Sequence, residues 1–147
     1  MIKKTLCALA LTLFATLANA QESTKEMMYA IKEGNTVQLD QLIDTNNINE
    51  CLEIGESSYN YLAISIKLKS LKSVAYFLDK NANIEGECTG KTALMYAAKY
   101  GHLDIAKYLI KRGADVHATY NGRSALDYAN RYERSDISTY LTEVEKE

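Results

Sequence analysis

Apolar side chains recur at helical spacing over residues 90–118, near the middle of the chain. A first predicted helix begins after Thr92, a residue type that caps helix starts, and ends at Gly101, which adopts a positive φ at little cost. Its apolar face consists of Leu94, Ala97 and Ala98. The apolar positions of a second predicted helix are Leu103, Ile105, Ala106, Leu109 and Ile110. Helices this short cannot bury a core alone, so the pattern predicts neighbouring units of the same kind.

The neighbouring units become visible when the sequence is shifted by about 32 residues. The shift aligns residues 122–129 with residues 90–97 and, in the other direction, places Leu62 under Leu94. A weaker copy starts near Lys25, where residues 30–35 match the pattern of residues 97–102. The sequence therefore predicts four units, which cover about 25–56, 57–88, 89–120 and 121–147.

Residues 90–118 closely resemble one ankyrin repeat, and a period in the low thirties is the one expected for that family. The resemblance covers nearly all of residues 25–143 and implies an all-α repeat solenoid of helix-turn-helix units with short hairpin-like turns. The chain contains no proline, and its first helices lack the family's Thr-Pro-Leu-His start. Lys69 stands where the family has a glycine between its helices. We therefore expect the usual Thr-to-His hydrogen bonds to be missing and the turn within residues 50–70 to be irregular.

Residues 1–20 have the pattern of an export signal. Lys3 and Lys4 precede an apolar run from Leu6 to Leu17, and Ala18-Asn19-Ala20 forms an Ala-x-Ala cleavage site. The run is too short to span a bilayer, although an uncleaved anchor is the alternative. The pattern predicts a cleaved bacterial signal peptide followed by an ankyrin repeat domain over residues 21–147. The expected location is the periplasm, with secretion as the second choice.

The charge of the mature chain excludes some partners. The whole chain has 17 basic and 19 acidic side chains, and cleavage removes two lysines, which leaves a net charge of −4 when both histidines are neutral. This charge gives no support to nucleic-acid binding. No later apolar run is long enough to cross a membrane. We expect a single elongated domain that is a monomer.

Two cysteines, Cys51 and Cys88, remain after cleavage. An even number of cysteines in an oxidising compartment favours a disulfide. The repeat register places both near the tips of adjacent turns, which are able to meet if residues 50–57 bulge. Free thiols and a redox sensor built on this pair are the alternatives, although the chain has no Cys-x-x-Cys motif.

The sequence carries none of the common catalytic motifs. It has no Gly-x-Ser-x-Gly, no phosphate-binding glycine loop and no His-Glu-x-x-His. His102 occupies a position at which the ankyrin family uses histidine for structural hydrogen bonds, and His117 is expected to be exposed on a turn. We therefore expect a protein that is not an enzyme and that needs no cofactor and no metal.

The resemblance to ankyrin repeats also implies where a partner docks, namely on the concave face made by turn tips and exposed positions of the first helices. The positions selected through the repeat register are rich in tyrosine and basic residues. They are Tyr59, Lys67, Lys91, Lys99, Tyr100, Tyr120, Arg123, Arg131 and Tyr132. Tyrosine and arginine are enriched at interface hot spots, and a basic groove favours an acidic partner. An ordinary solvated surface is the alternative, because the chain has eleven tyrosines but only two phenylalanines.

The leading hypothesis is a non-catalytic protein-binding module in the periplasm. It acts either as an immunity or inhibitor protein, or as an accessory protein of a periplasmic enzyme. Binding of a small ligand or of a cell-wall glycan is the alternative. The absence of tryptophan, the residue that most often stacks on sugars, weighs against a glycan.

Overall fold

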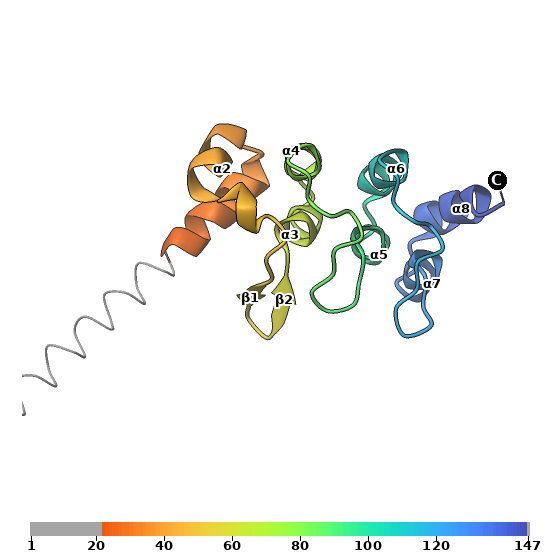
Figure 1. The fold of residues 1–147 in the computed structure, drawn as a ribbon. Coiled ribbons are helices and arrows are strands. Elements are labelled where there is room, and N and C mark those ends of the chain that lie inside the picture. The colour runs from red at the N-terminus through yellow and green to blue at the C-terminus, as the bar shows by residue number, and fades with distance from the viewer. Residues whose placement is uncertain (1–21, 147) are drawn as a thin grey trace, which may run out of the picture.

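The computed structural model describes residues 22–146 and consists of helix pairs stacked side by side in chain order (Figure 1). A helix over residues 22–33 precedes α2, and each later pair joins a first helix to a second helix. The first helices are α3 (Tyr61–Lys67), α5 (Ala93–Tyr100) and α7 (Ala125–Arg131). The second helices are α2 (Thr36–Leu42), α4 (Leu71–Asp79), α6 (Leu103–Lys111) and α8 (Ser135–Val144). This arrangement confirms the predicted solenoid; the predicted signal peptide lies outside the described residues.

Three segments project beyond the first helices, on the side away from the second helices (Figure 1). We call them fingers and define them as residues 51–60, 83–92 and 115–124. The first finger is an antiparallel hairpin of β1 (Leu52–Ile54) and β2 (Ser57–Tyr59), and it follows a short 3-10 helix over Thr45–Asn47. The face formed by the fingers and the first helices is called the finger face below.

Each first helix from α3 to α7 begins at a residue whose side chain caps it. Asn60 accepts a hydrogen bond from the Ala63 amide, and Thr92 and Ser124 accept from the third residue of their own helices. These caps stand 32 residues apart, and such a cap is worth about 1 kcal/mol. The capping residue therefore specifies where each of these three first helices begins.

All four helix pairs turn through the same backbone geometry. In each turn an amide donates to a carbonyl five residues earlier, and the four bonds are Asn35 to Ala30, Ser70 to Ser65, His102 to Ala97 and Arg134 to Ala129. The residue just before the donor has a positive φ in every case. Gly34 and Gly101 fill this place in two turns, whereas Lys69 (φ 57°) and Glu133 (φ 56°) fill it in the others. The expectation of an irregular turn near Lys69 is therefore wrong, because lysine adopts the left-handed conformation that glycine would have taken.

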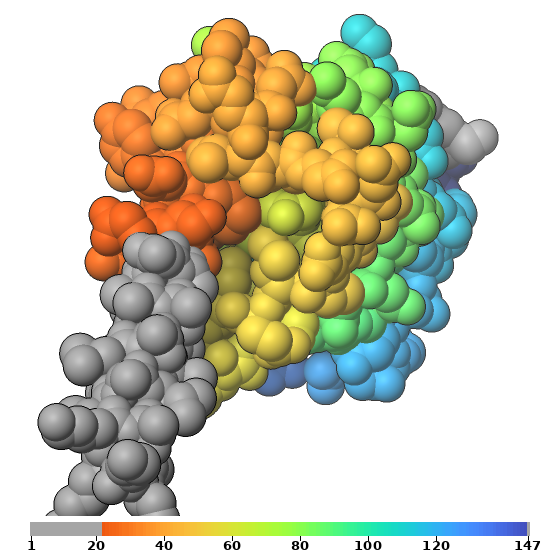
Figure 2. Space-filling view, turned by 60° about the vertical axis from the view of Figure 1, so that its left-hand side comes forward, coloured from red at the N-terminus to blue at the C-terminus, as the bar shows by residue number. Residues whose placement is uncertain are grey.

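The core lies between the two rows of helices and runs through all the units. Leu62 of α3 and Leu94 of α5 are each 1% exposed, and Phe77 of α4 is fully buried. Burying one such side chain stabilises the fold by about 1.5–3 kcal/mol. Ala97 and Ala129 are also fully buried, and their small side chains let α5 and α7 pack closely. The space-filling view shows the units in contact along the stack, from orange through green to blue (Figure 2). Within residues 22–146, no helix combines the length and apolar character that a membrane crossing requires.

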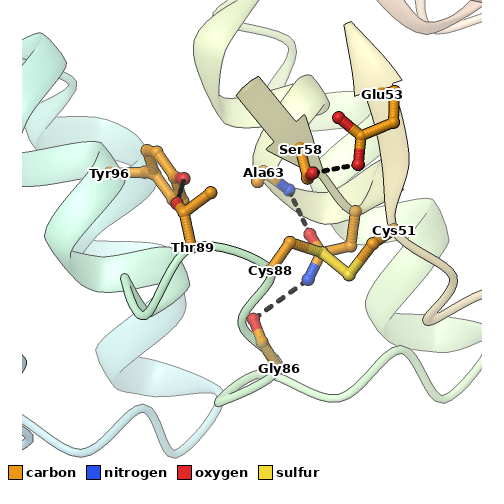
Figure 3. The surroundings of a disulfide bond; sticks show 9 residues. Cys51, Glu53, Ser58, Ala63, Gly86, Cys88, Thr89 and Tyr96 are labelled. Atoms are coloured by element: carbon orange, nitrogen blue, oxygen red, sulfur yellow. Dashed lines mark hydrogen bonds between the residues drawn. A yellow bond between two sulfur atoms is a disulfide. The ribbon is translucent and has the colours of Figure 1, made fainter. Parts of the chain in front are cut away.

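A disulfide joins the first two fingers, as the sequence predicts (Figure 3). Cys51, directly before β1, bonds to Cys88 in the second finger, and their Cα atoms lie 5.7 Å apart. Beside it, the Asn60 amide donates to the Gly86 carbonyl at 2.9 Å. The hairpin of β1 and β2, and not the expected bulge, brings Cys51 to this position.

Removing the disulfide should lower stability only when the wild-type protein is oxidised. The bond closes a loop of 37 residues, which the chain-entropy model converts into about 4 kcal/mol. Cys51→Ser should therefore lower the melting temperature by on the order of 10 °C without reductant. With reductant present, the variant and the wild type should melt together. Equal melting temperatures under oxidising conditions would show that the bond does not stabilise the stack.

Lys69→Gly should stabilise the protein, because glycine removes the clash of a Cβ in the left-handed region. The expected gain in the free energy of unfolding is about 1 kcal/mol, measured by urea denaturation. As a control, Lys107→Gly within α6 should lower stability by about 1 kcal/mol, since it introduces glycine into a helix. Destabilisation by both changes would contradict the left-handed turn.

Candidate binding interface

Three tyrosine rings lie in contact beneath the finger face, and Lys99 connects them to a fourth. We call Tyr59, Tyr96, Tyr100 and Tyr132 the tyrosine row. The Tyr59 and Tyr96 ring centroids lie 5.8 Å apart, and Tyr100 stacks on Tyr96 at 6.3 Å. Tyr132, which ends α7, is 38% exposed. The row runs from the first finger to the ends of α5 and α7 and crosses three units. Tyr59 and Tyr96 are buried in the core, so only Tyr100 and Tyr132 offer ring surface to a partner.

Two of the predicted lysines lie against the rings of this row. Lys67 Nζ is 4.4 Å from the Tyr59 ring centroid and donates to the Tyr59 hydroxyl at 3.3 Å. Lys99 Nζ lies 5.4 Å from the Tyr100 ring and 5.6 Å from the Tyr132 ring. Cation–π contacts at these distances hold an ammonium group beside the aromatic face without neutralising its charge.

A second cluster lies on the fingers. Lys91 Nζ is 5.4 Å from the Tyr120 ring, and this ring covers Gly90 of the preceding finger. A Cβ on Gly90 would lie only 1.8 Å from Tyr120 Cε2, so the close stacking of these fingers requires glycine. The predicted residues Arg123 and Arg131 are exposed. Among the described residues, their side chains join neither cluster.

The two rows of helices differ in how their charges are paired. Both ion pairs of the described residues, Lys80–Asp40 and Arg112–Asp79 at 2.8 Å, involve second helices. By contrast, the basic side chains of the finger face have no carboxylate partner among residues 22–146. Positive charge is thus available for an incoming group on the finger face.

The turn geometry identifies one basic residue that the sequence prediction omitted. In every turn a basic residue follows the carbonyl acceptor by two positions. We call this set the basic ladder; it consists of Lys32, Lys67, Lys99 and Arg131. Lys32 is exposed, and the match of residues 30–35 to residues 97–102 already contained the signal for it. The ladder therefore has one member in each of the four helix pairs.

Comparison with known proteins places this geometry in a family. The family model for ankyrin repeats (3 copies) matches residues 27–120 and residues 85–147. The chain is an ankyrin repeat protein. A search of the curated proteins finds no match to it. Ankyrin repeats generally mediate interactions between proteins, and the tyrosine row and the basic ladder are candidates for that contact.

Burial and hydrogen bonds shift the pKa values of three tyrosines in the row of this ankyrin repeat protein. Burial raises the pKa of Tyr100 to about 12, and the neighbouring Tyr59 adds to the shift. Burial also acts on Tyr59, but hydrogen bonds to Lys67 and Ser57 outweigh it and lower the pKa of Tyr59. Tyr96 donates to or accepts from Thr89 at 2.8 Å, and burial raises its pKa (Figure 3). Burial therefore favours the protonated form of Tyr96 and Tyr100.

His102 does not play the role that the family suggests for it. Its Nε2 atom is buried and has no hydrogen-bond partner within residues 22–146, which corrects the expectation of structural hydrogen bonds. The ring instead lies 6.1 Å from that of Tyr100. Burial and the charge of Lys69 lower the pKa of His102, so the imidazole is neutral at pH 7. His117 is exposed, as predicted.

The hollows of the surface offer little for a small ligand. One hollow of about 260 Å³ lies behind the end of the tyrosine row, between Tyr100 and the start of α8. Another, of about 240 Å³, lies between the helix over residues 22–33 and β1. No group of three or more histidine, cysteine, aspartate or glutamate side chains suited to a metal ion occurs in the described part of the chain. The flat, aromatic finger face is better suited to another protein.

The buried hydroxyl of Tyr100 predicts a loss of stability at alkaline pH. In the unfolded chain tyrosine ionises near pH 10, whereas Tyr100 in the folded protein ionises near pH 12. Its contribution to stability is therefore complete below pH 10 and is lost as the pH rises towards 12. The free energy of unfolding should fall over this range, and it should fall less steeply in Tyr100→Phe.

Urea denaturation at a series of pH values measures this difference. Part of the loss of stability at alkaline pH should remain in this variant. The reason is that burial and the neighbouring Asp40 also raise the pKa of Tyr76 to about 12. Tyr76→Phe should therefore reduce the slope as well. Parallel curves for the wild type and Tyr100→Phe would contradict the buried position of this hydroxyl.

Proposed function

We propose that this ankyrin repeat protein is exported and binds an acidic surface of a partner protein through its finger face, without catalysing a reaction. The observation that carries the proposal is the pair of lysines, Lys67 and Lys99, beside the tyrosine row, neither of which has a carboxylate partner in the described chain. Tyrosine supplies buried area and a polar tip, and a complementary field speeds encounter with an acidic partner.

Export to the periplasm is the location that agrees best with the cysteine chemistry. Disulfides persist in oxidising compartments and are rare in a reducing cytosol. Cys51 is exposed and Cys88 is half-buried, so a reducing environment would have access to their bond. The Lys-Lys, apolar and Ala-x-Ala pattern of residues 1–20 supports the same location.

Two roles remain for such a module in the periplasm. An immunity or inhibitor protein would cover the active site of its partner, whereas an accessory protein would hold the partner in a stable or productive state. Adding the purified protein to its partner separates the two roles. Stoichiometric loss of the partner's activity indicates inhibition, and unchanged or increased activity indicates an accessory role.

The double variant Lys99→Glu/Tyr132→Ala should lose the partner. Reversing the charge repels an acidic surface, and removing an exposed ring removes contact area, so affinity should fall at least about tenfold. The measurement is capture of the partner by the tagged mature protein from periplasmic extract, followed by titration with the purified partner. Higher salt should weaken wild-type binding, since exposed charges are screened.

A matched control tests whether the loss belongs to the finger face. Lys111→Glu/Tyr140→Ala places the same changes on the second helices α6 and α8. This control should bind like the wild type, and both variants should keep the wild-type circular dichroism. Equal loss by both variants, or binding unaffected in either, would refute the assignment of the finger face.

A further inference from the structure

The basic ladder repeats with the helix stack, and this repeat sets the spacing of its charges. Lys67, Lys99 and Arg131 occupy the same place near the ends of α3, α5 and α7. Helix α3 packs against α5, and α5 packs against α7. Packed helices lie about 8–10 Å apart, so the backbone positions of successive ladder residues are separated by about that distance, and their long side chains can place the charges at a similar interval. A ligand that meets all of them must carry its negative charges at the same interval.

A polyproline II segment offers this interval on one side of the chain. It has three residues per turn and rises about 3.1 Å per residue, so every third side chain points the same way after about 9.3 Å. A β-strand fails this test, because side chains three residues apart point to opposite faces. An α-helix meets it only with acidic residues seven apart, which are separated by about 10.5 Å.

The hydrogen-bond donors of the finger face favour the polyproline II segment over the helix. Carbonyl groups of an α-helix are already bonded within the helix, whereas those of a polyproline II segment are free to accept. The Lys99 ammonium, the Arg131 guanidinium and the Tyr132 hydroxyl have no hydrogen-bond acceptor among the described residues.

We infer that the finger face recognises an extended acidic segment of the partner, in polyproline II conformation, with a carboxylate at every third residue. Each carboxylate meets one member of the basic ladder, and the residues between them lie against the surface rings of Tyr100 and Tyr132. The inference rests on the proposed function, because it names the part of the partner that the finger face contacts. It assigns Lys32 to the same site as the three basic residues already predicted.

Synthetic peptides of identical composition test the spacing. One peptide contains four consecutive Glu-Pro-Ala triplets, and a second contains the same residues with its glutamates adjacent. An exposed ion pair strengthens binding by about two- to threefold, so a peptide that satisfies twice as many pairs should bind about fivefold more tightly. Fluorescence anisotropy of the labelled peptides with the mature oxidised protein measures both affinities. Equal affinities would overturn the inference, since only the number of charges would then matter.

Charge reversal tests the pairing of individual positions. Arg131→Glu, at an exposed side chain, should weaken the triplet peptide about fivefold or more, whereas Lys111→Glu on α6 should leave its affinity unchanged. Replacing one terminal glutamate of the peptide by lysine should restore binding to Arg131→Glu. If neither peptide, with its lysine at one end or the other, regains binding to Arg131→Glu, the segment does not lie along the ladder in a fixed register, and the inference is refuted.

Two further ligands decide between kinds of partner. A longer helical peptide with a glutamate at every seventh residue should bind more weakly than the triplet peptide, and tighter binding would replace the polyproline II segment by a helix. Polyphosphate should compete poorly at moderate salt; strong competition would show a general site for polyanions and would overturn the inference. If the periplasmic partner is lost by Lys99→Glu/Tyr132→Ala while the triplet peptide has no advantage, the proposed function holds and the inference alone fails.

Discussion

Each helix pair of this protein completes the burial of its apolar side chains against the neighbouring pairs of the stack. A helix of seven to ten residues is too short to be stable alone, so burial between neighbouring units holds the structure together. The packing forces the units into a common register, and the repeated turn bond shows that register directly. Residues about 32 positions apart therefore gather into lines, such as the basic ladder. The candidate interface is a direct consequence of the stacking.

The same constraint explains why the first fingers carry a covalent link. The first unit is the least regular copy of the repeat, and between it and α3 the chain forms a two-stranded hairpin, which is marginal by itself. Cys51–Cys88 ties this hairpin to the next finger, and the Asn60 side chain connects the start of α3 to the Gly86 carbonyl. Because Tyr59 ends the hairpin, the link also holds one end of the tyrosine row in place.

Charged side chains form ion pairs along the second helices, whereas the basic side chains of the finger face are unpaired in the described chain. On the second helices, Asp40 meets Tyr76 and Lys80, and Asp79 meets Arg112, so charges of adjacent units are paired. On the finger face, lysines lie against aromatic rings, which orient the ammonium groups but leave their charge available. These positive charges stay unpaired although the fingers also carry the carboxylates of Glu53, Glu56, Glu85, Glu87 and Asp115. Net charge alone would not have indicated an acidic partner, since complementarity acts through the local field.

The sequence by itself determined the repeat register and the cap at Thr92, and it favoured the pairing of the cysteines. These features follow from local chemistry and from a period that is visible along the chain. Only the tertiary structure decided the conformation at Lys69, the unpaired Nε2 of His102 and the place of Tyr96 in the tyrosine row. It also decided which basic residues are paired and which remain free. The physical reason is that each of these outcomes depends on side chains from neighbouring units, and their rotamers and burial are fixed only when the units pack together.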